Sequence, residues 1–232
     1  MPNAFVRKLQ RGVELTAIDR SRLIEATSRT QVVAPYTNLL REGDVQDNAY
    51  VILSGFAYCF KLLTNGERQI VAYLVPGDAD GLYGVTTENA DYSVVTLTPC
   101  TVAFISRDTI DDLLAHNPRI ARALWWSLLL EKSSLCASLT NVGQRPAPQR
   151  LAYLLCDLLS RLQAVGLARN GSFEIPLKQQ DFADILGITS VHTCRILKYL
   201  QKIDLLLHDY RTITIVDFDR LKNYADFSPT AY

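Results

Sequence analysis

The sequence has few histidines and no closely spaced cysteines. Of its 232 residues, only His116, His192 and His208 are histidines, and the five cysteines lie at positions 59, 100, 136, 156 and 194. No two of these thiols have the C-x-x-C spacing of a zinc or iron–sulfur ligand set. Their odd number also argues against a disulfide framework. We therefore expect reduced structural cysteines, no metal centre and no cofactor.

Long apolar runs and an excess of one charge are also absent. The longest apolar stretch, near Leu124–Leu130, is interrupted by Ser127 and is far shorter than the ~20 residues that cross a bilayer. Met1–Glu14 contains no apolar core or small-residue cleavage site, so we expect a cytoplasmic protein. Lys plus Arg and Asp plus Glu both number 24, so any surface for a polyanion must be local.

Residues 31–106 contain short β-prone runs rich in aromatic and β-branched side chains. Turn glycines recur at positions 43, 55, 66 and 77, within turn sequences such as Asn65-Gly66 and Pro76-Gly77-Asp78. This spacing predicts an antiparallel sandwich, such as a jelly roll, or an antiparallel barrel in an α+β protein. The expected strands are Tyr50–Leu53, Phe56–Leu63, Gln69–Val75 and Thr101–Ile105.

The chain then changes to helical periodicity. Asp108–Ala115 predicts a short helix, and a longer helix is expected from Asn117-Pro118 to about Val142. A helix of ~24 residues would be ~36 Å long, more than one face of a small β-domain covers. We expect its apolar stripe to form a homodimer interface, with packing on the β-domain as the alternative. Leu128, Leu135 and Val142 recur every seven residues, and Trp125, Lys132 and Leu139 form the adjoining row. From both rows and the turn before them, the candidate interface residues are Leu124, Leu128, Leu135, Leu139 and Val142.

A second domain is predicted after the hinge Gly143–Pro148. Leucines recur at helical spacing over Arg150–Gln163, and a polar loop follows at Ala164–Ser172. Two short helices, Lys178–Leu186 and Ser190–Gln201, are separated by three residues. A polar tip at His208–Arg211 and a β-run at Thr212–Val216 complete the pattern of a winged helix-turn-helix. The expected domains are residues 1–116, a dimerisation helix 117–142 and a DNA-binding domain 143–232.

The second helix of this motif carries cations and no acid. Gly187 suits the sharp turn, and Thr189 can cap the helix that follows. Between Gly187 and Ile203 there is no Asp or Glu. Because such a helix fits the major groove, Arg195 is the candidate for reading a guanine. We expect Val191, Ile196, Leu197 and Leu200 to face inward, and Ser190, His192, Thr193, Arg195, Lys198 and Lys202 to face another surface; Cys194 suits either side.

These features together resemble the CRP/FNR superfamily of bacterial transcription regulators over nearly the whole chain. The resemblance rests on Arg41-Glu42-Gly43-Asp44, Tyr50–Gly55, Pro76-Gly77-Asp78, Gln179–Gly187 and Arg195-Ile196-Leu197-Lys198. It implies a cyclic-nucleotide-binding-like barrel and a homodimer bound to double-stranded DNA at a palindromic operator. It also implies DNA contacts by Gln179, Thr189, Ser190, His192, Arg195 and Arg211. An activator of this kind would also contact RNA polymerase, but the residues do not distinguish an activator from a repressor.

The chain departs from the family pattern at several positions. Val191 stands where many relatives carry a glutamate that accepts from cytosine, so a different operator is expected. Lys178 replaces the usual Ser or Thr cap of the first motif helix. Gly84 is followed by Val85, and no Lys or Arg lies between Arg68 and Arg107, so no cation can hold a phosphate beside Glu88 and Asp91. We therefore predict that cAMP and cGMP do not bind, and the effector stays unknown.

Other sensor and enzyme classes fit poorly. No cysteine precedes Cys59, which excludes the family's N-terminal iron–sulfur cluster, and no histidine precedes His116 to ligate haem. A cupin-like enzyme needs several histidines inside the barrel, and no nucleophile–histidine pair, Walker loop or dinucleotide motif is present. We therefore expect that this protein is not an enzyme. A winged helix that binds protein instead of DNA stays open, and salt dependence would distinguish the two.

Overall fold

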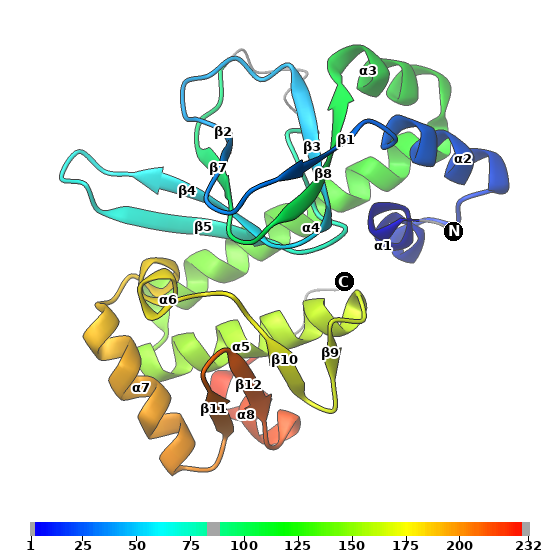
Figure 1. Ribbon diagram of the computed structural model, residues 1–232. Coiled ribbons are helices and arrows are strands. Elements are labelled where there is room, and N and C mark those ends of the chain that lie inside the picture. The colour runs from blue at the N-terminus through cyan, green and yellow to red at the C-terminus, as the bar shows by residue number, and fades with distance from the viewer. Residues whose placement is uncertain (1–2, 83–88, 229–232) are drawn as a thin grey trace. The chain divides into compact units, whose positions relative to one another are not determined.

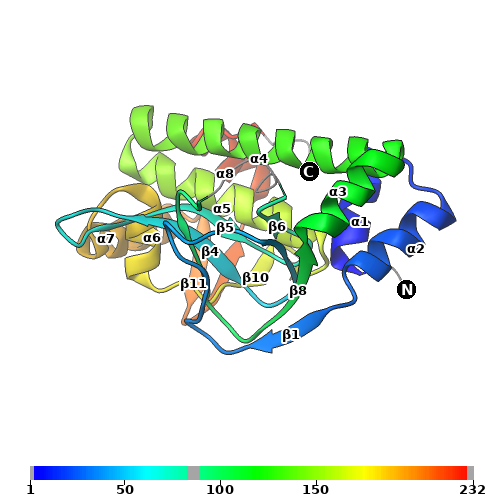
Figure 2. The same cartoon turned by 90° about the horizontal axis from the view of Figure 1, so that it is seen from above.

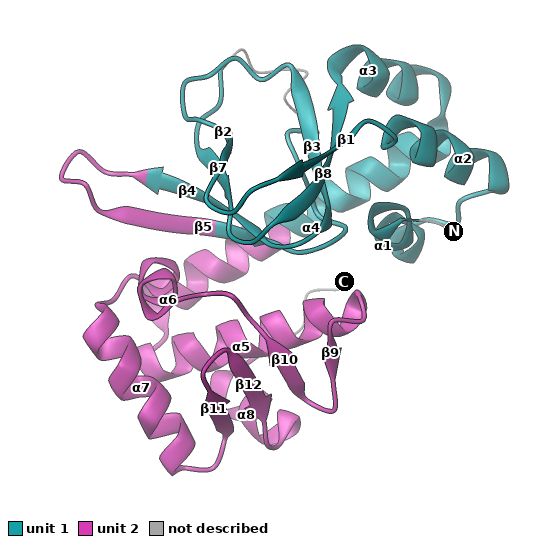
Figure 3. Cartoon of the chain, in the orientation of Figure 1, with its two compact units in different colours: residues 1–61, 72–132 teal, residues 62–71, 133–232 magenta. Residues whose placement is uncertain are grey.

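The computed structural model describes residues 3–82 and 89–228 (Figure 1). The chain divides into two compact units, Met1–Lys61 with Ala72–Lys132, and Leu62–Val71 with Ser133–Tyr232 (Figure 3). Each unit is thus assembled from segments that are distant in sequence. Among the helices that the structure describes, none combines the length and apolarity that a membrane span requires.

The first unit contains antiparallel β-structure, as the sequence predicts. Its described strands form two four-stranded sheets, and their hydrogen bonds do not close into one barrel. Tyr50 lies opposite Phe104 in the antiparallel ladder, with ring centroids 5.5 Å apart. One sheet has the order β1 (Thr30–Val33), β8 (Cys100–Ser106), β3 (Asn48–Ser54), β6 (Ala79–Asp80), and the other β2 (Asn38–Leu40), β7 (Ser93–Thr96), β4 (Ala57–Leu62), β5 (Arg68–Leu74).

Helices cover the β1-β8-β3-β6 sheet. Two of them, α1 (Ala4–Gly12) and α2 (Ala17–Ala26), were not predicted from the sequence, and with α3 (Arg107–His116) they gather at one end of this unit (Figure 2). Their N-termini are capped by Asn3, and by Thr16 with Asp19. Their apolar faces share one core with the sheet, which includes Phe5, Leu9, Leu23, Val51, Ala103, Ile105, Ile110 and Ile120.

The long helix α4 (Pro118–Gln144) is confirmed but extends further than predicted. Gly143 is helical, so only Arg145 and Pro146 separate α4 from α5 (Ala147–Ala164). Side chains support this tight junction, because Asn141 Nδ2 donates to the Arg150 carbonyl oxygen at 3.1 Å and Arg150 Nε to the Arg145 carbonyl at 2.7 Å. Of the segment Gly143–Pro148, predicted as a hinge or domain boundary, only Arg145 and Pro146 are therefore outside the helices.

The second unit contains the expected helix-turn-helix on a helical base. The leucines of α5, from Leu151 to Leu162, are buried at the spacing that the sequence indicates. Phe182, Leu186, Ile196, Leu197 and Leu200 complete this core. The elements that follow α5 are β9 (Ala168–Arg169), β10 (Ser172–Glu174), α6 (Gln179–Leu186), α7 (Ser190–Lys202), β11 (Leu206–Asp209), β12 (Thr212–Ile215) and α8 (Phe218–Ala225), with a sheet in the order β11-β12-β10-β9.

Candidate nucleic-acid interface

A three-residue turn joins α6 to α7. Gly187 ends α6 in the left-handed conformation, with φ of 62°, and its N–H donates to the Ala183 carbonyl oxygen. A side chain at this position would also come within 3.4 Å of Val142 Cγ1. Thr189 Oγ1 then accepts from the His192 N–H at 3.2 Å and caps α7. The predicted turn residues therefore fix how α7 leaves α6.

One face of α7 packs inward and the other faces solvent. Thr193, Ile196, Leu197 and Leu200 are buried at three- and four-residue spacing. Val191 was predicted to face inward, but its side chain is 60% exposed because it lies off this spacing. The exposed residues of α7 are Val191, His192, Arg195, Lys198, Tyr199 and Lys202, while Ser190 and Cys194 are partly buried.

Thr193 does not lie on the exposed face. Its side chain is fully buried, and its hydroxyl donates to the Thr189 carbonyl oxygen at 3.1 Å. The periodicity of α7 contains this information, since Thr193 precedes Ile196 by three residues and Leu197 by four. A threonine in this position stabilises the capped turn and leaves contact with a ligand to its neighbours.

The exposed face of α7 is positively charged. Within the part of the chain that the structure describes, neither Arg195 nor Lys198 forms an ion pair. The first turn of the helix contains no acid, so the positive end of the helix dipole is not neutralised there. This face can therefore attract phosphate groups while a planar guanidinium reaches further into a groove.

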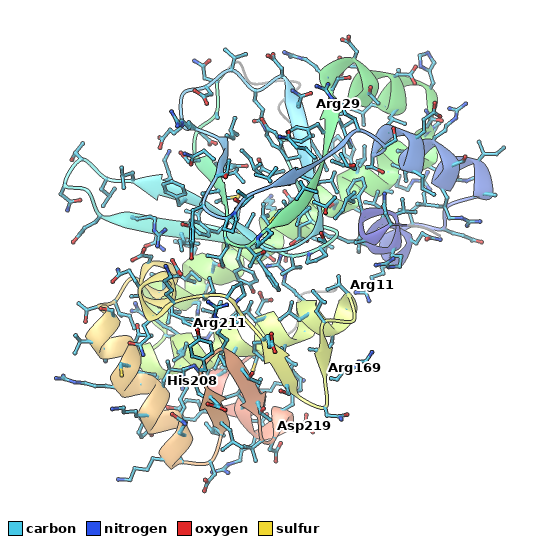
Figure 4. All side chains as sticks on the ribbon, viewed as in Figure 1. Arg11, Arg29, Arg169, His208, Arg211 and Asp219 are labelled. Atoms are coloured by element: carbon cyan, nitrogen blue, oxygen red, sulfur yellow. The ribbon has the colours of Figure 1, made fainter. Side chains whose placement is uncertain are left out.

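The β11–β12 hairpin forms the wing. Figure 4 marks His208 and Arg211 on it, and Arg169 on β9. Arg211 is exposed, and its guanidinium lies 5.3 Å from the ring centroid of Tyr210. Tyr210, which the sequence analysis did not single out, is 84% exposed. The sequence signal that could have identified Tyr210 is an aromatic residue next to an arginine in a predicted hairpin turn.

The N-terminus of α6 is capped in an unexpected way. Lys178 provides no side-chain cap, as predicted, but its backbone N–H donates to Asp181 Oδ2 at 2.8 Å. Gln179, the first residue of α6, is exposed. Asp181 thus makes one of the two hydrogen bonds of a capping box, and the Lys178 side chain does not make the other.

The apolar stripe of α4 is only partly exposed. Leu135 and Leu139 are exposed, with Leu139 at 76%, while Leu128 and Val142 are partly buried. Leu124 is 4% exposed and belongs to the core of the first unit. Two residues that the candidate interface did not include, Trp125 and Leu129, are widely exposed. A seven-residue repeat alone did not reveal which residues of α4 are buried.

The interior of the first unit is acidic. Asp80 is buried, and its Oδ1 accepts a hydrogen bond from the Tyr92 hydroxyl at 2.6 Å. Burial raises the pKa of Asp80 to about 6.

The residues used above to argue against a phosphate site include Gly84, Val85 and Glu88, which lie outside the described residues. Among the side chains that are described, no group of three or more metal-ligating residues gathers.

Comparison with known families agrees with both units. Residues 30–117 match the family model of the cyclic nucleotide-binding domain, and residues 149–224 match that of the Crp-like helix-turn-helix domain. The two models together cover most of the chain.

Individual proteins with similar sequences and folds are regulators. The chain is 28% identical to the nitrogen fixation regulation protein FixK of Azorhizobium caulinodans, over 87% of this chain and 81% of that protein. It is 25% identical to the transcriptional activator protein Anr of Pseudomonas protegens, over 88% and 84%. The fold is similar to that of FixK2 from Bradyrhizobium japonicum, with a TM-score of 0.76, 24% identity, and coverage of 84% of this chain and 96% of that one. The chain belongs to the CRP/FNR superfamily of bacterial transcription regulators.

Proposed function

We propose that this protein is a sequence-specific, DNA-binding transcription regulator that acts as a homodimer. The observation that carries this proposal is the exposed, acid-free face of α7, presented after a tight turn from α6. A helix in this setting fits the major groove of B-DNA. The related proteins named above are regulators and activators of transcription, which supports the same function.

The residues have separate roles in this proposal. Arg195 donates to O6 and N7 of a guanine, and Ser190 and His192 contact neighbouring base edges or phosphates. Lys198 and Arg211 bind phosphates of the DNA, and Gln179, at the start of α6, contacts the DNA backbone. Thr189 contributes chiefly by capping α7, and Thr193 holds the turn from inside.

The dimer forms through the exposed row of α4. Trp125, Leu129, Leu135 and Leu139 leave an apolar surface that a second copy can cover. Two helix-turn-helix motifs would then occupy a palindromic operator, with half-sites about one duplex turn apart. In this scheme residues 1–116 form a jelly-roll sensor, 117–142 the dimerisation helix and 143–232 the DNA-binding domain, and the bound dimer could recruit RNA polymerase in the cell. The first domain does not respond to cAMP or cGMP in this scheme, and it senses either a different signal or none.

The test is a selection of bound sequences from a random duplex pool. Wild-type protein should enrich an inverted repeat, and Arg195→Ala should lose ~1–3 kcal/mol of discrimination at one position in each half-site. Arg41→Ala, which removes an exposed arginine of the first unit, is the matched control and should select the wild-type repeat. Absence of any duplex binding at low salt, where phosphate contacts are strongest, contradicts the proposal.

A further inference from the structure

The tip of the β4–β5 hairpin contributes an arginine to the second unit. Leu62–Val71 belong to that unit, in whose colour they are drawn in Figure 3. Arg68 Nη2 lies 2.7 Å from Asp181 Oδ1 and 2.6 Å from Asp184 Oδ2, and its Nε also donates to Asp184 Oδ2 at 2.7 Å. The side chains of Arg68, Asp181 and Asp184 are 24%, 8% and 10% exposed. One guanidinium therefore neutralises two largely buried carboxylates of α6.

A second contact joins the same hairpin to the same helix. Gln69 Nε2 donates to the Ile185 carbonyl oxygen at 3.2 Å. Carbonyls in the last turn of a helix lack partners within the helix, so this donor satisfies a group that α6 cannot satisfy itself. Asp181, Asp184 and Ile185 lie three and four residues apart, on one face of α6. The hairpin thus contacts α6 from its first turn to its last.

The two aspartates also organise α6. Asp181 Oδ2 accepts from the Lys178 N–H at 2.8 Å, and Asp184 Oδ1 accepts from Gln180 Nε2 at 2.7 Å. Like charges one helical turn apart repel each other unless a cation lies between them. Since the capping carboxylate is one of this pair, loss of Arg68 would disturb the turn that presents Gln179.

We propose that Arg68 is a positioning residue for the DNA-binding element, acting through Asp181 and Asp184. This inference rests on the proposed function, because the first helix of a helix-turn-helix crosses the DNA backbone, where uncompensated acids repel phosphates. A planar guanidinium can serve both carboxylates with several directed hydrogen bonds, and an ammonium cannot do so equally well.

The hairpin also links α6 to the first unit through the covalent chain. β4 and β5 are neighbours in the β2-β7-β4-β5 sheet, whose other strands belong to the first unit. Arg68 is therefore joined to the sheet through the chain and to α6 through its ion pairs.

The first test measures affinity for the selected operator by fluorescence anisotropy. Arg68→Ala should weaken binding by about tenfold, the effect of losing one charge-assisted pair, and Arg68→Lys should recover part of it. The matched control is Lys61→Ala, which removes the same charge from the same hairpin, where Lys61 Nζ lies 3.0 Å from Glu42. Binding by Arg68→Ala that equals that of Lys61→Ala, or that is tighter than wild type, overturns the proposal.

A double-mutant comparison separates the clamp from a general loss of positive charge. In an Asp184→Asn background, Arg68→Ala should cost much less affinity than it does in the wild type, because half of the acidic partner is already neutral. An equal loss in both backgrounds would mean that Arg68 acts without Asp184 and would overturn the assignment.

A third measurement needs no DNA. Hydrogen exchange of the α6 amides, Gln179–Leu186, should be faster in Arg68→Ala than in Lys61→Ala. If the wild type binds no duplex, the proposed function fails, and this exchange still decides whether Arg68 positions α6. Equal exchange in the two variants would show that it does not.

Discussion

Both units bury acids, but they differ in the charge that they leave without a cation or an acid beside it. The first unit buries acids: Asp78 and Asp80 are 6% and 4% exposed, and Asp78 is paired with Lys8 at 2.8 Å. The second unit exposes cations on α7, over a stretch from Gly187 to Ile203 that contains no acid. Equal totals of 24 acidic and 24 basic residues conceal this separation.

This difference bears on which of the two units can bind a phosphate. A phosphate requires cationic or N–H donors, and the exposed face of α7 supplies them at a surface that a duplex can reach. The interior around Asp80 would repel an anion, and burial strengthens that repulsion because the local dielectric constant is low. A fold that binds cyclic nucleotides in its namesake proteins therefore need not do so here.

The largest effect is expected where a buried ion pair is broken in the first unit. Lys8→Met removes the ammonium 2.8 Å from the buried Asp78 carboxylate and should lower the free energy of unfolding by about 3–5 kcal/mol. The lower end applies because Asp78 Oδ2 also accepts from the Val75 N–H at 2.8 Å. Urea unfolding followed by tryptophan fluorescence reports this change, since Trp125 and Trp126 both belong to the first unit.

The control is an exposed pair on the same unit. Lys61→Met breaks the contact with Glu42, whose two side chains are both nearly half exposed, and should cost at most ~1 kcal/mol. Equal losses for Lys8→Met and Lys61→Met would show that burial does not set the strength of these pairs.

A smaller, pH-dependent effect is expected at Asp80. Burial raises its pKa from 3.8 to about 6, so the folded state binds more protons than the unfolded state between these values. The contribution of Asp80 to the free energy of unfolding of the protein therefore falls as the pH rises from ~4 to ~6. At ~1.4 kcal/mol per pKa unit, the total decrease is up to about 3 kcal/mol.

Asp80→Asn removes this titration and keeps an acceptor for the Tyr92 hydroxyl. We expect the variant to be more stable than the wild type at pH 7.5 and equally stable below pH ~4. Urea midpoints measured at both pH values test the difference. If the two proteins change in parallel across this range, Asp80 does not titrate as its burial indicates.

The sequence predicted the elements whose periodicity is set by their own residues. The apolar spacing of α5, the turn glycine at Gly187 and the start of α4 at Pro118 follow from local chemistry, and the structure agrees. The helices α1 and α2 were missed because short helices near a terminus depend on a core supplied by residues far along the chain, such as Ile105 and Ile120.

The sequence predicted the kind of site, a cationic helix face, better than it predicted the burial of individual residues. The cations of α7 were placed on the correct face, but Val191 and Leu124 were not, because burial depends on which neighbour packs against each row of a helix. The pairing of Arg68 with Asp181 and Asp184 joins residues more than a hundred positions apart, and nothing in their local sequence indicates it. Such contacts are decided by tertiary packing alone.

The smallest expected effect is the one that cyclic nucleotides should have on the first unit. A ligand present at 100 times its dissociation constant stabilises a protein by about 2.7 kcal/mol, which raises the melting temperature by several degrees. Titration with cAMP or cGMP should produce no such shift, because the described interior offers Asp80 and Tyr92 in place of a cation. A saturable shift in the wild type would show that phosphate is held by groups other than these, and the contrast between an anion-repelling interior and a phosphate-binding surface would no longer hold.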